Sequence, residues 1–237
     1  IIAAHGDRGG LMTNRLAGTI AGKISRTGRF ADVAVGLLRG DPLLEEVGSS
    51  LPGDAVRVYP LFMSCGYYVE NAIPECLKIG PGGLDAAGRK VEVMKPIGVR
   101  PVMARIVESI ARHTAAEAGF KPDESGILLA AHGSTKDPSS RQATRAVARQ
   151  IADKQVFNRI DCAFLEEPPF LGEAVSALAG PLVVVGMFIG EGMHGHDDLR
   201  AAVTDAGRKD IALAPPLARW PDLAAAACDD ILAAPGN

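Results

Sequence analysis

The sequence predicts an α/β fold with two similar lobes, each a parallel four-stranded sheet flanked by helices. Two observations support this prediction. Short apolar runs alternate along the chain with longer segments whose apolar residues recur at helical spacing, and strands that alternate with helices require parallel pairing and right-handed crossovers. In addition, the second half of the chain repeats the landmarks of the first half in the same order.

The periodicity places each element along the chain. Leu16, Ile20 and Ile24 recur every four residues, which is typical of a helix with one buried face. The run from Leu182 to Val185 is continuously apolar, as expected for a strand that is covered on both faces. Strands are predicted at about 1–5, 32–38, 55–63, 91–96, 126–131, 160–165, 181–188 and 210–214. Helices are predicted at about 14–26, 101–118, 140–154, 169–179, 196–207 and 221–233.

Recurring landmarks indicate that the two halves are copies of one fold. The matching pairs are His5 and His132, Pro42 and Pro168, Tyr68 and His194, and Pro101 and Pro221. The first three offsets are 127, 126 and 126 residues, and such a common spacing is what a duplication predicts. The fourth is 120, which indicates that about six residues were lost from the second copy, near the position of the turn at 80–88. We therefore expect an N-terminal lobe at 1–120 and a C-terminal lobe at 121–237, joined near the polar, Pro-containing segment 120–125.

Composition excludes several classes of function. Charged residues make up 22% of the 237 residues and the net charge is −3, whereas a nucleic-acid partner normally requires a basic surplus. No apolar run approaches the roughly 18 residues that a membrane span needs, and the sequence has no signal-peptide pattern, so we expect a cytoplasmic protein. The four cysteines form no C-x-x-C pair, which makes a disulfide framework improbable.

Candidate ligands for a metal ion follow the predicted strands of the second half. His132 follows the first strand, Glu166 the second, and His194 the third, with His196 two residues later. Ligands of open parallel sheets gather outside the carboxyl ends of the strands, so these side chains are expected at one edge. Two imidazoles and a carboxylate suit a divalent ion such as Co²⁺, Fe²⁺, Ni²⁺ or Zn²⁺. Glu167 is an alternative to Glu166, although the strand register favours Glu166.

The first half carries different residues at the equivalent strand ends. His5 is retained, but Arg39 stands in place of the carboxylate and Tyr68 in place of the second histidine. A cation and a phenol are poor ligands for these ions, so this copy is expected to have a degenerate site. His5 either helps to line a substrate pocket or makes only structural hydrogen bonds. Cys65 lies near the same edge, where a metal contact is conceivable.

The motifs of both halves resemble those of the class II tetrapyrrole chelatases, in particular the CbiX-like sirohydrochlorin cobaltochelatases. In the second half the matching segments are LLAAHGS, AFLE and MFIGEGMHGHDDL, and in the first half they are IIAAHGDR, PLFMSCGYYVENAIP and PIGVRP. The resemblance implies two flavodoxin-like (Rossmann-like) lobes with a cleft between them that takes a flat macrocycle. It also implies that the working histidines and glutamate belong to the C-terminal lobe.

The activity implied by the resemblance is ATP-independent insertion of a divalent metal into sirohydrochlorin or a related tetrapyrrole, in cobalamin or siroheme biosynthesis. Co²⁺ is the first choice of metal, followed by Fe²⁺ and then Ni²⁺. His132 and His194 would hold the ion, and Glu166 would neutralise charge or take up a pyrrole proton. His196 would be a further ligand or a proton shuttle. An imidazole suits both tasks, since it binds divalent ions and accepts protons near neutral pH.

The carboxylates of such a substrate require cations at its binding site. The substrate-binding candidates are His5, Arg8, Arg39, Tyr68, Lys136 and Arg141, with Arg100 and Arg219 as further cations. No Walker A or G-x-G-x-x-G signature is present, so we expect no nucleotide cofactor. Two other hypotheses remain: a non-catalytic tetrapyrrole or metal carrier, and a small-molecule binding protein with a structural metal. The expected state is a monomer or a homodimer.

Overall fold

The computed structural model describes residues 1–6, 12–189 and 195–234. The chain forms two compact units, one of Ile1–Arg100 with Pro221–Asn237 and the other of Pro101–Trp220. We call them the first lobe and the second lobe. Each has a four-stranded parallel sheet, in the order β2-β1-β3-β4 or β6-β5-β7-β8. The predicted two-lobed α/β fold with flavodoxin-like strand order is confirmed.

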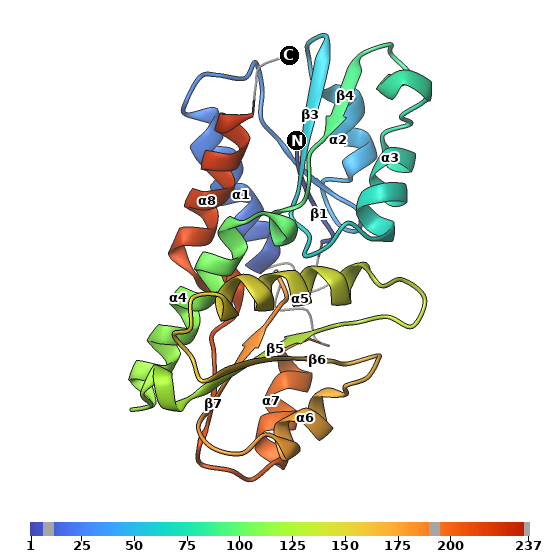
Figure 1. The fold of residues 1–237 in the computed structure, drawn as a ribbon. Coiled ribbons are helices and arrows are strands. Elements are labelled where there is room, and N and C mark those ends of the chain that lie inside the picture. Colours follow the sequence, from blue (N-terminus) through green and yellow to red (C-terminus); the bar gives the residue numbers. More distant parts are fainter. Residues whose placement is uncertain (7–11, 190–194, 235–237) are drawn as a thin grey trace. The chain divides into compact units, whose positions relative to one another are not determined.

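In the first lobe, helices cover both faces of the sheet. The elements are β1 (Ile2–Ala4), α1 (Met12–Ser25), β2 (Val35–Leu37), α2 (Leu44–Ser50), β3 (Ala55–Pro60), η1 (Tyr68–Ala72), α3 (Ile73–Cys76), β4 (Lys90–Val93) and α8 (Pro221–Ala233), with short turns at Pro81–Gly83 and Ile97–Val99. Helices α1 and α8 lie on one face, whereas α2 and α3 lie on the other (Figure 1).

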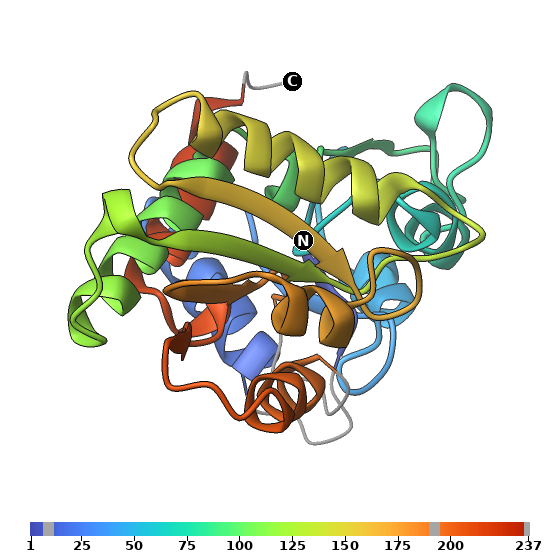
Figure 2. The same cartoon turned by 60° about the horizontal axis from the view of Figure 1, so that its bottom comes forward.

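The second lobe repeats this arrangement. Its elements are α4 (Val102–Glu117), β5 (Gly126–Ala131), α5 (Ser139–Ala152), β6 (Arg159–Phe164), α6 (Leu171–Ala177), β7 (Leu182–Gly186), α7 (His196–Asp205) and β8 (Ile211–Leu213), with short turns at Pro122–Glu124 and Leu217–Arg219. Figure 2 shows α5 above the sheet and α6 and α7 below it. Every residue of β5 is buried, as its apolar sequence predicts, so polar chemistry along this strand is confined to its ends.

The compact units differ from the division that we expected at residues 120 and 121. Helix α4 belongs to the second lobe, where Glu108 forms an ion pair with Lys154, two residues after the end of α5. Helix α8 belongs to the first lobe, where it packs against α1 and Asp230 pairs with Arg100. The last helix of each sequence half therefore covers the sheet of the other half. Apolar periodicity shows that a helix has a buried face, but not which sheet that face covers.

The structure also adjusts one of the sequence landmarks. Helices α1 and α5 have equal lengths and an offset of 127 residues, as do α2 and α6. Isolated bridges join Leu37 to Leu43 and Phe164 to Phe170, again 127 apart. Pro42 therefore corresponds to Pro169 rather than to Pro168. At the ends of β3 and β7 the offset is 126, since Pro60 pairs with Ala3 and Gly186 with Ala130.

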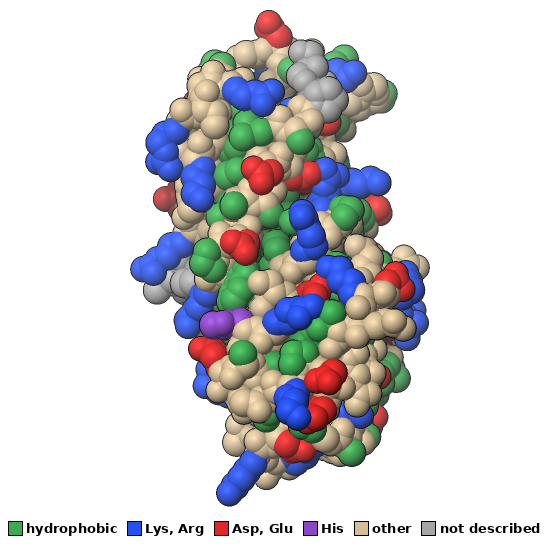
Figure 3. Space-filling view, turned by 60° about the vertical axis from the view of Figure 1, so that its left-hand side comes forward, with side chains coloured by type: hydrophobic (Ala, Val, Ile, Leu, Met, Phe, Trp, Pro, Cys, Tyr) green, Lys and Arg blue, Asp and Glu red, His purple; other side chains and the backbone are tan. Residues whose placement is uncertain are grey.

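The surface agrees with the modest net charge. On the face shown in Figure 3, Lys and Arg side chains are interspersed with Asp and Glu. Within the described ranges, no helix combines the length and apolar character that crossing a membrane would require. All four cysteines are free thiols.

Candidate functional site

The candidate site lies at the carboxyl edge of the second-lobe sheet. β5 is hydrogen-bonded to β6 on one side and to β7 on the other. The strand order reverses between β5 and β7, because β6 is added on one side of β5 and β7 on the other. In open parallel sheets, ligands bind beside such a switch point, outside the carboxyl ends of the strands. β5 ends at Ala131, so the next residue, His132, stands at this edge, and Glu166 follows the neighbouring β6. This confirms the expected neighbourhood of the first and third strands of the lobe.

His132 and Glu166 form a side-chain pair at this edge. The Nε2 atom of His132 lies 3.2 Å from Oε1 of Glu166, and both side chains are more than half exposed (56% and 57%). Two ligands that each lie ~2.1 Å from one metal ion are ~3.0–3.4 Å apart in octahedral or tetrahedral geometry. The observed separation is therefore compatible with both atoms binding one ion, and also with a proton shared between them.

The backbone fixes the relative position of the two loops that carry this pair. The His132 carbonyl oxygen accepts hydrogen bonds from the backbone N–H groups of Leu165 (3.1 Å) and Glu166 (2.9 Å). Gly133 follows with a φ of +73°, and a Cβ atom there would lie 2.8 Å from Cγ of Glu167. A side chain at this position would be strained by the backbone and would also displace Glu167. The sequence Ala-His-Gly therefore allows the histidine loop to approach the loop after β6.

Glu167 has a different environment from Glu166. Its side chain is only 3% exposed and forms an ion pair with Arg141, while Oε1 accepts a hydrogen bond from the Ser134 N–H at 3.0 Å. The carboxylate of Glu167 is therefore occupied by partners within the lobe, whereas the carboxylate of Glu166 lies beside His132. Arg141, which we expected to bind substrate, has Glu167 as its partner. The sequence predicts Arg141 among the loop cations, whereas it lies in the first turn of α5, and no sequence pattern indicated its contact with Glu167.

The structure leaves part of the predicted ligand set untested. His194 and the candidate cation Arg8 lie outside the described residues. His196 is the first residue of α7, and its Nε2 atom lies 3.3 Å from Nη2 of Arg200 one turn later. Among the described side chains, no group of three His, Cys, Asp or Glu residues has the geometry to hold a metal ion. The ligand set of His132, Glu166, His194 and His196 therefore remains a prediction.

The equivalent edge of the first lobe carries an aromatic cluster. The rings of His5 and Tyr68 meet edge-on with centroids 4.8 Å apart, and Phe62 stacks on Tyr68 at 5.8 Å. Nδ1 of His5 donates to the Gly6 carbonyl oxygen at 3.0 Å. The exposed Arg39 donates its backbone N–H to the carbonyl oxygen of His5 at 2.9 Å. His5 thus makes a structural hydrogen bond and also contacts an exposed aromatic residue, Tyr68.

Other candidates differ in their availability. Lys136 is exposed in the loop between β5 and α5, whereas Arg100 is engaged by Asp230. Arg219 lies in the turn that precedes α8. Burial, together with the nearby Glu70 carboxylate, raises the pKa of the Cys65 thiol. Since the thiolate is the form that binds metals, Cys65 is a weak candidate ligand.

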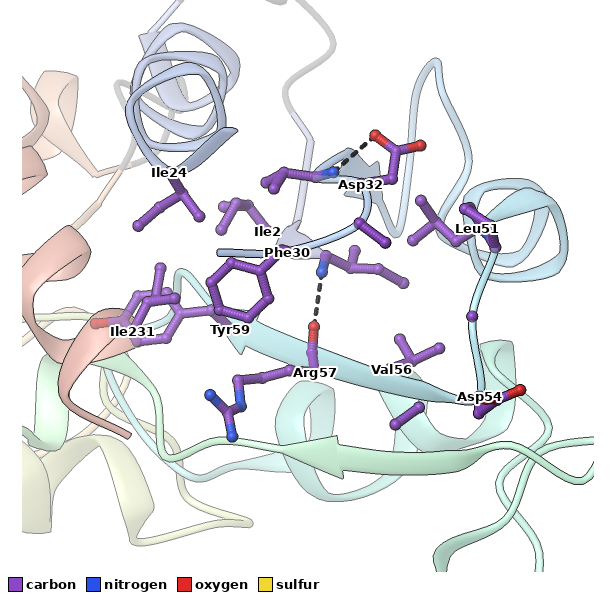
Figure 4. A pocket seen from close by; sticks show the side chains of 16 residues that line it. Ile2, Ile24, Phe30, Asp32, Leu51, Asp54, Val56, Arg57, Tyr59 and Ile231 are labelled. Atoms are coloured by element: carbon purple, nitrogen blue, oxygen red, sulfur yellow. Dashed lines mark hydrogen bonds between the residues drawn. The ribbon is translucent and has the colours of Figure 1, made fainter. Parts of the chain in front are cut away.

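An open cavity of about 260 Å³ lies at the opposite edge of the first-lobe sheet (Figure 4). Its walls include Ile2 and Val56, at the starts of β1 and β3, together with Phe30 and Ile231. This is the amino edge of the strands, whereas the predicted ligands follow the carboxyl ends. The cavity is therefore separate from the candidate chemistry.

Comparison with known proteins agrees with the fold and with the motifs. A sequence profile of the CbiX family matches residues 1–114 and 126–234. The chain is 25% identical over 217 residues to a protein of Halobacterium salinarum named probable sirohydrochlorin cobaltochelatase. The aligned region covers 84% of this chain and 74% of that protein.

Two solved structures are also similar. CbiX, described as the terminal enzyme for biosynthesis of siroheme in denitrifying bacteria, gives a TM-score of 0.79 at 26% identity, covering 99% of this chain and 98% of that chain. SirB from Bacillus subtilis, solved with Fe³⁺, gives a TM-score of 0.80 at 15% identity, covering 98% and 92%. At that identity the likeness to SirB concerns the fold alone.

Proposed function

The chain belongs to the CbiX family, and from this premise we propose that it inserts a divalent metal ion, Co²⁺ in the first place, into sirohydrochlorin without ATP. The observation that carries the proposal is the pair of His132 and Glu166. Nε2 of His132 and Oε1 of Glu166 lie 3.2 Å apart at the carboxyl edge of a parallel sheet, next to its switch point, and both side chains are open to solvent. An imidazole and a carboxylate at this distance can hold an ion while other coordination positions remain open to an incoming ligand.

The reaction exchanges the ligands of the ion for four ring nitrogens and releases two pyrrole protons. In our proposal, Nε2 of His132 binds the ion together with His194, which follows the neighbouring strand β7. Glu166 balances the positive charge and takes up a released proton, since its carboxylate faces the same imidazole. His196, at the start of α7, would relay protons or provide a further ligand.

Substrate recognition is assigned to residues of both lobes. The substrate carries many carboxylates, and the exposed Lys136 and Arg39 provide cations in loops that follow the strands. The exposed ring of Tyr68, supported by His5 and Phe62, offers an aromatic surface against which a flat macrocycle could stack. Arg8 and Arg141 complete the proposed set, although Arg141 already has a partner in Glu167.

The metal and the pathway are the finer parts of the proposal. One relative is named for cobalt and another for siroheme, an iron tetrapyrrole. Imidazole and carboxylate ligands accept several divalent ions, and selectivity follows geometry and metal supply. We propose Co²⁺ first and Fe²⁺ second, which corresponds to cobalamin or siroheme biosynthesis.

A direct assay tests the proposal. Purified protein is mixed under anaerobic conditions with metal-free sirohydrochlorin and one of Co²⁺, Fe²⁺ or Ni²⁺, and absorption is followed over time. We expect insertion well above the protein-free rate, fastest with Co²⁺. His132→Ala should abolish the difference. His113→Ala is the matched control, because His113 is in the same lobe, is 52% exposed and also pairs with a glutamate, Glu117.

The outcomes separate the enzyme from a carrier. A carrier would bind sirohydrochlorin or Co²⁺ without accelerating insertion. Equal loss of activity in the His132 and His113 variants would show that the chemistry lies elsewhere. Faster insertion of Fe²⁺ than of Co²⁺ would leave the activity standing and overturn the choice of metal.

A further inference from the structure

Glu167 is buried beside an exposed site residue. It is 2% exposed, although the preceding residue, Glu166, faces solvent with more than half of its side chain. Burying a carboxylate is costly unless hydrogen bonds and a countercharge compensate for the lost hydration. A buried charge at the edge of a candidate site is therefore expected to have specific partners that compensate for its burial.

The contacts of Glu167 connect three segments around the site. Oε1 accepts the Ser134 N–H in the loop after β5, two residues beyond His132. Oε2 binds the guanidinium group of Arg141, which lies in the first turn of α5. Glu167 itself follows Glu166 directly along the chain. One carboxylate thus joins the loop of the candidate imidazole, the loop of the candidate carboxylate and a rigid helix.

The first lobe has the same backbone fold with different residues at these positions. At the offset of 127 shared by α1 with α5 and by α2 with α6, Glu167 corresponds to Gly40 and Arg141 to Asn14. A glycine has no side chain with which to join the loops. The carboxylate link is therefore not a requirement of this fold, and it occurs in the lobe that carries the pair of His132 and Glu166.

We propose that Glu167 is a positioning residue that holds His132 and Glu166 at the separation needed to bind one divalent ion. The proposal rests on the proposed function. Glu167 acts through its neighbours: Ser134 fixes the direction of the histidine loop, and Arg141 anchors the carboxylate to α5. Residues that orient metal ligands in this way typically change metal affinity by about 10- to 100-fold when they are replaced.

Glu108 provides a matched control in the same lobe. It is 7% exposed and its carboxylate bonds to Arg112 and Lys154, yet it lies within α4 rather than at a strand end. Glu167→Gln and Glu108→Gln both remove a buried negative charge that has a cationic partner. They are expected to lower the melting temperature of the metal-free protein to a similar degree. Only Glu167→Gln should change the affinity of the protein for Co²⁺.

The experiment measures the binding of Co²⁺ alone by titration, without the tetrapyrrole. We expect Glu167→Gln to weaken Co²⁺ binding by about 10- to 100-fold, and Glu108→Gln to change it less than about twofold. In the His132→Ala background, Glu167→Gln should have little further effect, because Glu167 acts through that histidine. Unchanged Co²⁺ affinity in Glu167→Gln, or full additivity with His132→Ala, would overturn the proposal.

A second variant covers the case in which Glu167→Gln does not fold. Arg141→Gln keeps the acceptor for Ser134 but removes the anchor on α5, so it should weaken Co²⁺ binding in the same direction by a smaller factor. Wild-type affinity in this variant would count against the role of Glu167. Failure of the proposed function can be told apart from failure of this proposal. In the first case the wild-type protein would bind Co²⁺ without inserting it into sirohydrochlorin, whatever the affinity of the Glu167 variant.

Discussion

The two lobes present the same backbone edge with different side chains. In the second lobe, the histidine after the first strand faces a carboxylate at 3.2 Å. In the first lobe, the equivalent His5 donates to a backbone carbonyl oxygen and contacts the ring of Tyr68, and an arginine replaces the carboxylate. The comparison teaches that strand order creates a place for a site, whereas the residues that follow the strands decide its chemistry.

The largest expected contrast is between the insertion rates of two variants, in which His132 or its equivalent His5 is replaced by alanine. His132→Ala should lower the rate of Co²⁺ insertion by roughly 10²- to 10⁴-fold, because it removes a proposed ligand of the ion and the imidazole that faces Glu166. His5→Ala should lower the rate less than about tenfold, since Arg39 stands where the second lobe has Glu166 and His5 at most lines the substrate pocket. Initial rates from absorption measure both. Similar losses in the two variants would mean that the lobes share the chemistry.

A double substitution sharpens the assignment within the second lobe. If His132 and His194 bind one ion, His194→Ala should also remove most activity, and the double variant should be little slower than the slower single variant. Two effects that simply add on the free-energy scale would indicate independent roles. Crystals soaked in Co²⁺ give a direct check through the anomalous signal beside His132.

Glu166 and Arg39, which follow the second strand of the second and the first lobe respectively, provide the next contrast. Glu166→Gln should lower kcat by about 10- to 100-fold, since the amide cannot neutralise the ion or accept a proton. Arg39→Gln should instead raise KM a few-fold with little change in kcat, because a cation here can only bind the carboxylates of the substrate. A loss of kcat in Arg39→Gln would contradict the separation of roles.

Tyr68 tests whether the first lobe contributes surface rather than chemistry. Tyr68→Phe should retain activity within about twofold, because the ring that could stack on the macrocycle is kept. Tyr68→Ala should raise KM by up to about tenfold, in line with an aromatic contact of ~1 kcal/mol. Steady-state kinetics with sirohydrochlorin separate KM from kcat. Loss of activity in Tyr68→Phe would assign a role to the hydroxyl group.

The smallest effect on activity is expected at Glu108, within α4. Burial opposes its ionisation, but hydrogen bonds from Lys154 and Arg112 hold the pKa of Glu108 below its ordinary value of 4.5. A lowered folded-state pKa stabilises the protein above pH 4.5, and this stabilisation is lost as the pH falls below that value. Glu108→Gln should therefore reduce stability at pH 7 and flatten its decline below pH 4.5. Urea unfolding across this range measures both, and an unchanged acid slope would contradict the assignment.

Apolar runs made most of the fold predictable from the sequence. β5 occupies residues 126–131, as predicted from its apolar run, and α8 begins and ends at the predicted residues 221 and 233. The exchange of α4 and α8 could not be predicted, because the amphipathic pattern of a helix does not identify its partner sheet. The choice between Glu166 and Glu167 depended on one residue of strand register, and the two are told apart by their contacts in the structure: Glu166 lies beside His132, whereas Glu167 is bound by Ser134 and Arg141.

The exchanged helices also determine which segment of the chain could fold by itself. A protein made of residues 121–237 alone would lack α4 while retaining α8, so its sheet would have an uncovered apolar face and its last helix no partner within the fragment. The contiguous segment 101–220 is the piece expected to fold by itself. Each lobe thus depends on a helix from the other half of the sequence, so a cut near residue 120 would damage both lobes.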